Sequence, residues 1–500
     1  MKTNWILAIV SVMAGVHSQP APSQIPIPEK DLRITTPGSP FGAGWAFLYG
    51  YMMFPAATYM PTLRELGGGF TKVYLLWNQI EPEKGHYDWR AVDAFTSQLN
   101  SPGEGLISIF SSSKWATRVS TDMLPPSPAK NPDDYYRFIH DLVVRAKGRV
   151  RYWENDAEPN NPIYWSGTKE EFVSELKLFY KAVKDADPSA TVIVGGYDGM
   201  FGLPGEHQFP GQEVSLAFFD YVLKEGAKSF DIFDLRLYGD PYTIVARVNF
   251  MRQKMLALGY DKPIFATEYG GPNFFELPVN RKYFTLIASW TQAASKPGSP
   301  NPGKQQIADM YKNMGALAPQ TQMFMLDCPP ELEAKYERIQ ARGLVMRNVL
   351  AFSAGVQKML YWQFLHATGE RDDLMTLMYG KIGMVGFDSS GPTKRYMVAD
   401  VFKRMTGALE GVQSVKQVPV EGHPEIFMFE VTRAKQWTSY VAWLKADQWA
   451  ADDTPPVAFD FQWPAKRKID ASDAFGQSVD IQVRDGRAHL AVSATPVFIQ

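Results

Sequence analysis

The chain has 500 residues, of which 45% are hydrophobic, 21% charged and 13% aromatic. This composition excludes a disordered, collagen-like or disulfide-scaffold protein. Lys and Arg number 51 and Asp and Glu 53, so the formal net charge is −2. Because binding to duplex nucleic acid depends on a basic surface, no nucleic-acid partner is expected. The single cysteine, Cys328, excludes an intrachain disulfide.

Residues 1–18 are typical of a signal peptide. Lys2 precedes an apolar run, Trp5–Val16, and small residues around Ser18 are followed by a Pro-rich stretch. We therefore expect a cleaved leader and a secreted or periplasmic mature protein. The apolar run is too short to span a bilayer comfortably, and no later stretch reaches about 18 consecutive apolar residues, so no membrane span is expected.

Short β-rich runs alternate with longer helical patterns over residues 41–406. The predicted strands are Gly42–Phe47, Lys72–Trp77, Leu106–Phe110, Val150–Asp156, Val192–Gly196, Ile232–Leu237, Pro263–Glu268 and Lys358–Gln363. The predicted helices include Pro132–Lys147, Lys169–Ala186, Leu216–Gly226, Tyr242–Leu258 and Leu332–Phe352. Eight alternating units predict an α/β fold, a closed (β/α)8 TIM barrel of parallel strands. The wider spacing before the last strand predicts a long insertion at about residues 271–330, over the catalytic face.

The pattern changes after about Gly407 to short alternating runs separated by Pro, Gly and Asp turns. These runs are Glu425–Val431, Ser439–Trp443, Val457–Phe461 and His489–Val492. They predict a small C-terminal antiparallel β-sandwich domain over residues 407–500, without catalytic residues. Residues 19–40 form a Pro-rich N-terminal segment, in which Leu32–Thr35 could add a strand to this domain.

Two glutamates follow predicted strands on opposite sides of the barrel. Glu158 comes directly after the fourth strand, and Glu268 ends the seventh. Active sites of (β/α)8 barrels form at the C-terminal ends of the strands. Hydrolysis of a glycosidic bond needs one carboxylic acid to protonate the leaving oxygen and a second carboxylate opposite it. Either glutamate alone could be a surface charge, but their joint placement favours glycosidase chemistry.

Five stretches in chain order carry motifs, namely Trp77–Trp89, Trp153–Asn160, Leu235–Tyr238, Pro263–Gly270 and Tyr361–Trp362. They resemble, in the same order, W-x-x-I-E-P-x-x-G-x-Y-D-W, W-E-x-x-N-E-P-N, H-x-Y, P-I-x-x-T-E-x-G and the sugar-subsite aromatic of the clan A retaining glycoside hydrolases. Family 39 and its relatives are the most similar within the clan. The resemblance covers most of the mature chain, including Thr495–Val497, which is similar to the last strand of the accessory β domain common there.

The resemblance implies roles for four side chains. Glu158 occupies the acid/base position, Glu268 that of the nucleophile, Tyr238 that of a tyrosine contacting the nucleophile, and Trp362 the floor of the sugar subsite. We expect cleavage of a poly- or oligosaccharide by double displacement, with the pKa raised at Glu158 and low at Glu268. No cofactor or metal is expected, and the oligomeric state is not defined by the sequence.

Aromatic side chains near the strand ends have two interpretations. Trp77, Trp115 and Trp362 could stack on the apolar faces of sugars or could pack in the core. His366 follows the eighth strand and could line the rim of the site or have a structural role. Each residue therefore remains a candidate for substrate binding.

Polar candidates and departures from the family pattern concern the substrate. Asp156, Asn160 and Arg236 could bind sugar hydroxyls or a carboxylate, or could form structural bonds at the strand ends. Ala157 stands where the family has the Asn that grips the 2-hydroxyl, and Arg236 stands where it has a His. The buried fork of an arginine suits a uronate or sulfate, so we expect a substrate with an anionic or otherwise modified group rather than an ordinary neutral pyranoside. The alternative is a catalytically silent carbohydrate-binding protein on the same scaffold.

Glu154 lies on the same strand as Glu158 and, by period-two alternation, points to the same face. This placement predicts an internal barrel residue. Its basic partner could be Arg151 or Lys72.

Overall fold

The computed structural model describes residues 32–45, 58–197, 212–295, 301–366, 369–434, 438–463 and 469–500. The expected signal peptide, residues 1–18, lies outside this part of the chain. Within these ranges, no helix combines the length and the apolar character needed to cross a membrane.

Eight parallel strands close into a barrel in sequence order. They are β1 (Phe41–Gly44), β2 (Phe70–Leu76), β3 (Gly105–Phe110), β4 (Tyr152–Asn155), β5 (Thr191–Tyr197), β6 (Ile232–Leu235), β7 (Ile264–Tyr269) and β8 (Lys358–Tyr361). β1 pairs in parallel with both β2 and β8, which closes the barrel. Each strand overlaps a predicted run, and the predicted TIM barrel is confirmed.

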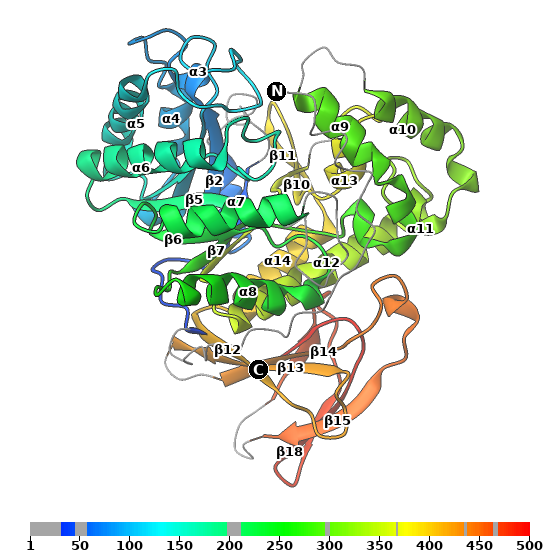
Figure 1. Ribbon diagram of the computed structural model, residues 1–500. Coiled ribbons are helices and arrows are strands. Elements are labelled where there is room, and N and C mark those ends of the chain that lie inside the picture. Colours follow the sequence, from blue (N-terminus) through cyan, green and yellow to red (C-terminus); the bar gives the residue numbers. More distant parts are fainter. Residues whose placement is uncertain are drawn as a thin grey trace.

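Helices cover the outside of the barrel (Figure 1). They are α2 (Tyr59–Glu65), α3 (Trp77–Ile80), α4 (Arg90–Thr96), α5 (Pro132–Ala146), α6 (Lys169–Ala186), α7 (Gln212–Glu225), α8 (Ile244–Ala257), α12 (Pro330–Ser353) and α14 (Met397–Ala408). Local signals fix their starts. Asn131 caps α5 by accepting from the Asp133 amide, and Thr168 and Glu171 form a capping box at α6. The five predicted helices are therefore present, α6 with its predicted bounds.

The barrel interior is built in layers. Seven apolar side chains, one from each of β2 to β8, fill the N-terminal end: Phe70, Leu106, Tyr152, Ile193, Ile232, Phe265 and Leu360. Because side chains alternate between the faces of a strand, residues two positions further along also face the interior. Several of those residues are polar and fully buried, namely Lys72, Ser108, Glu154, Asp234 and Thr267. The interior therefore changes from apolar to charged towards the C-terminal ends of the strands.

The predicted insertion at residues 271–330 is helical. It contains η7 (Phe274–Glu276), η8 (Pro278–Tyr283), α9 (Thr285–Ser295), α10 (Pro302–Lys312), η9 (Met314–Ala316) and α11 (Pro319–Gln322). Its apolar side chains form a cluster of their own, which includes Phe274, Met323 and Leu377 of α13 (Leu374–Tyr379). Figure 1 shows α9, α10 and α11 gathered on one side, next to α12 and α13. After β8 the chain adds a small sheet of β9 (Leu365–His366), β10 (Val385–Asp388) and β11 (Gly391–Arg395).

Two antiparallel sheets form the C-terminal domain. One has the order β12–β13–β14–β19–β16 and the other β15–β18–β17. Their bounds are β12 (Val412–Val418), β13 (Ile426–Arg433), β14 (Thr438–Leu444), β15 (Val457–Gln462), β16 (Ala471–Asp473), β17 (Ile481–Arg484), β18 (Arg487–Val492) and β19 (Val497–Ile499). Met428 and Ile499 of one sheet pack with Phe459 and Leu490 of the other. The predicted β-sandwich is confirmed, whereas residues 32–35 form no strand and contribute one backbone hydrogen bond from Ile34 to Gln413.

The barrel and the first sheet of the β domain share one apolar core. Phe429 and Trp443 belong to the same cluster of buried side chains as the barrel helices. The Trp443 ring stacks on Phe429, and its Nε1 donates to the hydroxyl of Tyr242, which precedes α8, at 3.2 Å. The β domain therefore completes the packing of the barrel.

Trp443→Ala should lower the free energy of unfolding by about 3–5 kcal/mol, because it opens a cavity in this shared core. Thermal or urea unfolding measures the change. Val483→Ala, at a valine of β17 that is 36% exposed, is the control and should change stability by less than about 0.5 kcal/mol. Equal stability of the Trp443→Ala and wild-type proteins would contradict a shared core, as would a folded chain ending near Gly407.

Candidate active site

The charged layer of the barrel is an ion-pair network. Lys72 Nζ lies 2.6 Å from Glu154 Oε2 and 3.7 Å from Glu268 Oε1, and it donates to Thr267 Oγ1 at 3.0 Å. Of the two basic partners proposed for Glu154, the structure therefore selects Lys72. Asp234 on β6 accepts from both the amide and the hydroxyl of Thr267, at 2.8 and 2.6 Å. Strands β2, β4, β6 and β7 are thus joined by buried charges below the barrel mouth.

Glu158 and Glu268 face the same guanidinium group. Arg236 Nε lies 3.3 Å from Glu158 Oε1, and Arg236 Nη2 lies 3.4 Å from Glu268 Oε1. The two carboxyl side chains retain 13% and 10% exposure, whereas Arg236 has none. The geometry therefore brings both predicted glutamates together at a nearly enclosed site with limited access to solvent.

Local backbone features place these side chains. Asp156 and Glu158 adopt positive φ angles of 42° and 49°, so the chain turns sharply as it leaves β4. On β7 the pairing with β8 shifts register between Ala266 and Tyr269, at the position of Glu268. Irregularities of this kind re-aim a side chain relative to a regular strand.

Tyr238 orients the carboxyl group of Glu268. Its hydroxyl donates to Glu268 Oε2 at 3.0 Å, as the resemblance implies. Arg247 of α8 donates to the Tyr238 carbonyl at 2.5 Å. Arg347 of α12 donates to the next carbonyl, that of Gly239, at 2.7 Å. The segment that carries Tyr238 is therefore held from two helices.

Burial governs the ionisation of Glu268. It raises the pKa of this carboxyl group to about 7, and the Lys72 ammonium offsets part of the rise. The expectation of a low pKa at Glu268 is therefore wrong. Desolvation penalises the charged form more than the neighbouring cation favours it.

An aromatic and apolar cluster adjoins the glutamates, because it includes Tyr238, which donates to Glu268, and Ala157, which precedes Glu158. It consists of Tyr74, Leu76, Phe110, Ala157, Tyr238 and Trp362, with Leu124, Tyr164 and Tyr379 packed against it. Trp362 is 8% exposed, and its ring meets Tyr74 edge-on at 5.6 Å between centroids. Trp362 therefore lies where a ring could contact a sugar at the site, and its role as a sugar platform stays a prediction.

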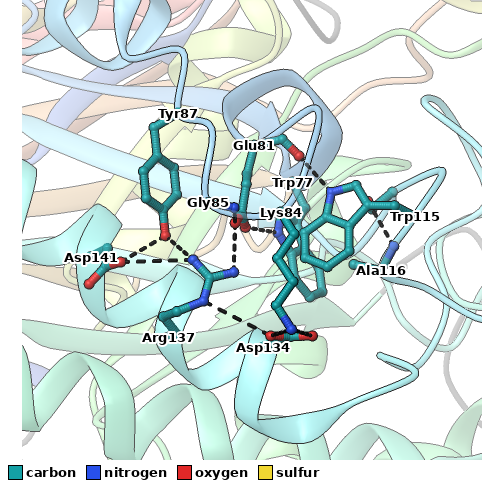
Figure 2. A network of polar contacts seen from close by, with 11 residues as sticks. Trp77, Glu81, Lys84, Gly85, Tyr87, Trp115, Ala116, Asp134, Arg137 and Asp141 are labelled. Atoms are coloured by element: carbon teal, nitrogen blue, oxygen red, sulfur yellow. Dashed lines mark hydrogen bonds and ion pairs between the residues drawn. The ribbon is translucent and has the colours of Figure 1, made fainter.

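Trp77 is not a sugar platform. Its ring is 0% exposed and stacks on Phe138 of α5, so neither face is open to a ligand. Its Nε1 donates to Glu81 Oε2 at 2.8 Å, and Arg137 donates to the same carboxyl group at 2.6 Å. Figure 2 shows this network, in which Trp115 lies against Trp77. Trp115 is half-buried and donates to the Glu81 carbonyl at 2.9 Å, and its contact with sugar stays a prediction.

Asp156 is also structural. Its side chain is fully buried, and its two oxygens accept from the amide and the hydroxyl of Ser111 at 2.8 and 3.0 Å. Burial raises the pKa of this carboxyl group well above its usual range. Asn160 donates to Ser215 of α7, a contact that fixes the loop after β4, and its contact with substrate stays a prediction.

Two further expectations concern His366 and Arg236. His366 lies in β9 with its ring stacked on Tyr396 at 3.9 Å, and burial lowers its pKa to about 4. This packing favours the structural interpretation. The Arg236 guanidinium is fully buried and lies within the charged network, and its contact with an anionic group of the substrate stays a prediction.

Sequence reasoning missed Asp234 and Thr267 as parts of the site. The available signal was period-two alternation, because both residues lie two positions after an apolar interior residue of their strand. Among the described residues, no group of three or more His, Cys, Asp or Glu side chains could hold a metal ion.

Comparisons with known proteins identify the fold. No protein-family model matches the sequence, and no curated protein is significantly similar to it. A family 39 glycoside hydrolase of Bacteroides cellulosilyticus WH2 superposes with a TM-score of 0.60 at 15% identity, over 95% of this chain and 82% of that one. A family 39 β-xylosidase of Caulobacter crescentus gives 0.51 at 13% identity, over 92% and 95%.

A family 51 α-L-arabinofuranosidase of Bifidobacterium longum gives a TM-score of 0.53 at 11% identity, over 92% of this chain and 94% of that one. The matches extend over nearly the whole described chain, barrel and β domain together. The protein therefore has the fold of the clan A glycoside hydrolases.

Glu268→Gln should stabilise the protein more at pH 8 than at pH 5. With a folded-state pKa of about 7 against an ordinary value of 4.5, the carboxyl group holds its proton more tightly in the folded state. This tighter proton binding stabilises the folded state fully below pH 4.5, and the stabilisation is lost as the pH rises through about 7. The free energy of unfolding changes by up to about 3 kcal/mol in total. Urea unfolding of both proteins across this range measures the difference, and Glu331→Gln at an exposed helical position is the control. A difference that does not vary with pH would contradict the raised pKa.

Proposed function

We propose that the protein is a retaining glycoside hydrolase in which Glu268 is the nucleophile and Glu158 the acid/base. The observation that carries this proposal is the convergence of both carboxyl groups on Arg236, with Tyr238 donating to Glu268. A retaining mechanism requires two carboxyl groups about 5–5.5 Å apart. The clan A fold supports the same reaction class.

In the first step, a Glu268 oxygen attacks the anomeric carbon and forms a covalent ester with the sugar. Glu158 gives its proton to the glycosidic oxygen, whose bond to the anomeric carbon breaks, and the leaving group departs as an alcohol. In the second step, Glu158 takes a proton from water, and the resulting hydroxide displaces Glu268 from the anomeric carbon. Tyr238 holds the non-attacking oxygen of Glu268 in place.

Ionised Glu268 is the reactive form, and its pKa of about 7 in the free protein predicts the acid limb of activity. Below this pH the nucleophile is protonated, so kcat/KM should fall as the pH drops through about 7. The aromatic cluster with Trp362 supplies apolar faces for a sugar ring. These features support a poly- or oligosaccharide as the substrate.

The retained pair of glutamates favours catalysis over silent binding, and aryl glycosides test the choice. Glu268→Gln should abolish turnover. Glu158→Gln should cost about 10²–10⁴-fold with a poor leaving group and much less with a nitrophenolate, which needs no proton. The first-formed sugar should keep the anomeric configuration of the substrate, as NMR of the products shows. Glu81→Gln is the control, because Glu81 is a buried glutamate of the motif that belongs to the network of Figure 2 and not to the site. This variant should be less stable than the wild type but should have a kcat close to that of the wild type.

Sugar binding without turnover by the wild-type protein would favour the silent carbohydrate-binding alternative. Full activity of Glu268→Gln would overturn the assignment of the nucleophile.

We also propose that residues 1–18 direct export and are then removed. Lys2, the apolar run Trp5–Val16 and the small residues around Ser18 support this proposal. Expression in a secreting host should yield a mature protein whose N-terminus lies close to Gln19, as intact mass measures. Intracellular protein that retains Met1 or Lys2 would contradict export.

A further inference from the structure

Arg236 is the side chain that both proposed catalytic glutamates share. Two of its nitrogens face Glu158 and Glu268, at 3.3 and 3.4 Å. The third, Nη1, lies 2.9 Å from Asp234 Oδ2 and donates to Thr267 Oγ1 at 2.5 Å. Nη1 is thus hydrogen-bonded to protein, whereas Nε and Nη2 lie within ion-pair distance of the carboxylates without a hydrogen bond to them. The side chain is fully buried.

We propose that Arg236 is a positioning residue, which fixes the placement and the charge state of both glutamates and does not bind the substrate. This inference rests on the proposed function. It assigns the positioning of both glutamates to one buried side chain. Ala157 cannot contribute to this task, because its side chain has no polar group. A planar fork of donors can contact two carboxylates at once, which an ammonium group cannot do with the same geometry.

The neighbouring strand provides the space for this guanidinium. A Cβ added to Gly196 of β5 would lie 2.8 Å from Arg236 Nε and 2.6 Å from Asp234 Oδ2. Real Cβ atoms essentially never approach so closely, so the side chains of Arg236 and Asp234, both fully buried, would have to shift. Glycine at position 196 is therefore part of the arrangement that seats Arg236.

The balance of charged groups around Glu158 and Glu268 explains how Arg236 affects the ionisation of these glutamates. The titratable and charged groups that face Glu268 or its partners are Lys72 on β2, Glu154 on β4, Glu158 after β4, Asp234, Arg236 and Tyr238. Four carboxyl groups thus share two cations. Loss of Arg236 would leave Lys72 as the one cation among these described groups, and repulsion between carboxylates would then favour protonated forms.

The same balance bears on the substrate. An anionic group placed beside these carboxylates would meet their excess negative charge, with the Arg236 cation already engaged. We therefore expect a neutral sugar at the position next to Glu158 and Glu268. This expectation replaces the uronate or sulfate that the sequence favoured.

Arg236→Gln and Arg236→Lys separate the charge of Arg236 from its geometry. In Arg236→Gln, kcat should fall by about 10²–10³-fold, and the acid limb of kcat/KM should move to higher pH by about 1 or more. In Arg236→Lys, the charge remains, so the acid limb should stay close to that of the wild type while kcat stays low. A residue that binds substrate would instead raise KM at unchanged kcat, and that result would overturn the proposal.

Arg252→Gln is the matched control. Arg252 is also a buried arginine, at 2% exposure. It donates to the Ala354 carbonyl and pairs with Asp261, and neither partner belongs to the charged network. This variant should be less stable than the wild type but should keep its pH profile. A profile that moves equally in Arg252→Gln and Arg236→Gln would mean that the effect is general loss of packing, and the proposal would fall.

Two measurements do not depend on turnover of the arginine variants. The stability lost in Arg236→Gln should be larger at pH 8 than at pH 5, because protonation relieves the repulsion. Gly196→Ala keeps every charge but displaces the guanidinium, and it should lower kcat, whereas Gly407→Ala, with nothing near its added Cβ, should not. A pH-independent loss in Arg236→Gln, or full activity of Gly196→Ala, would overturn the proposal.

The wild-type protein gives the last test. Matched aryl glucosides and glucuronides differ only at C6, which is a neutral hydroxymethyl group in the first and a carboxylate in the second, and kcat/KM should favour the neutral member by at least about tenfold. Preference for the glucuronide would overturn the inference about Arg236. If the protein hydrolysed none of the aryl or natural glycosides, that result would instead count against the proposed function. The pH dependence of the stability of Arg236→Gln would still decide the role of Arg236.

Discussion

A buried guanidinium between carboxylates is the interaction on which the site depends. Arg236 is fully buried, so its charge is acceptable only because Asp234, Glu154, Glu158 and Glu268 surround it. Removal of one partner from a buried ion pair typically costs several kcal/mol, because the other charge is left uncompensated. The same attraction that keeps the barrel interior stable therefore also holds the two glutamates at the mouth.

The surrounding fold protects this arrangement at each level. The apolar layer below it, with Phe70 and Phe265 among its members, excludes water from the N-terminal end of the barrel. The helices beside it hold the Tyr238 segment, and Arg347 links that segment to Glu276 of the insertion at 3.2 Å. The β domain packs on the same core through Trp443. Parts of the chain far from the glutamates thus determine how precisely they are placed.

The sequence predicted the architecture because the strands, helices and turns have local signals. It also predicted that Glu158 and Glu268 lie close together, since strand ends of a barrel converge at one mouth, and both carboxyl groups face Arg236. It could not predict exposure. Trp77 lies at a strand end, yet α5 covers its ring. Arg236 faces the interior by alternation, but only the packing of Gly196 and Asp234 shows that it points into the network rather than into the mouth.

A crystal structure with a sugar bound at the mouth would test the central claim most directly. The account predicts that the sugar contacts Glu158, Glu268 and Trp362 and that the two carboxyl groups lie about 5–5.5 Å apart. It also predicts that Arg236 stays within ion-pair distance of both glutamates without touching the ligand. An Arg236 guanidinium turned towards the sugar, with the glutamates separated or directed into different cavities, would contradict it.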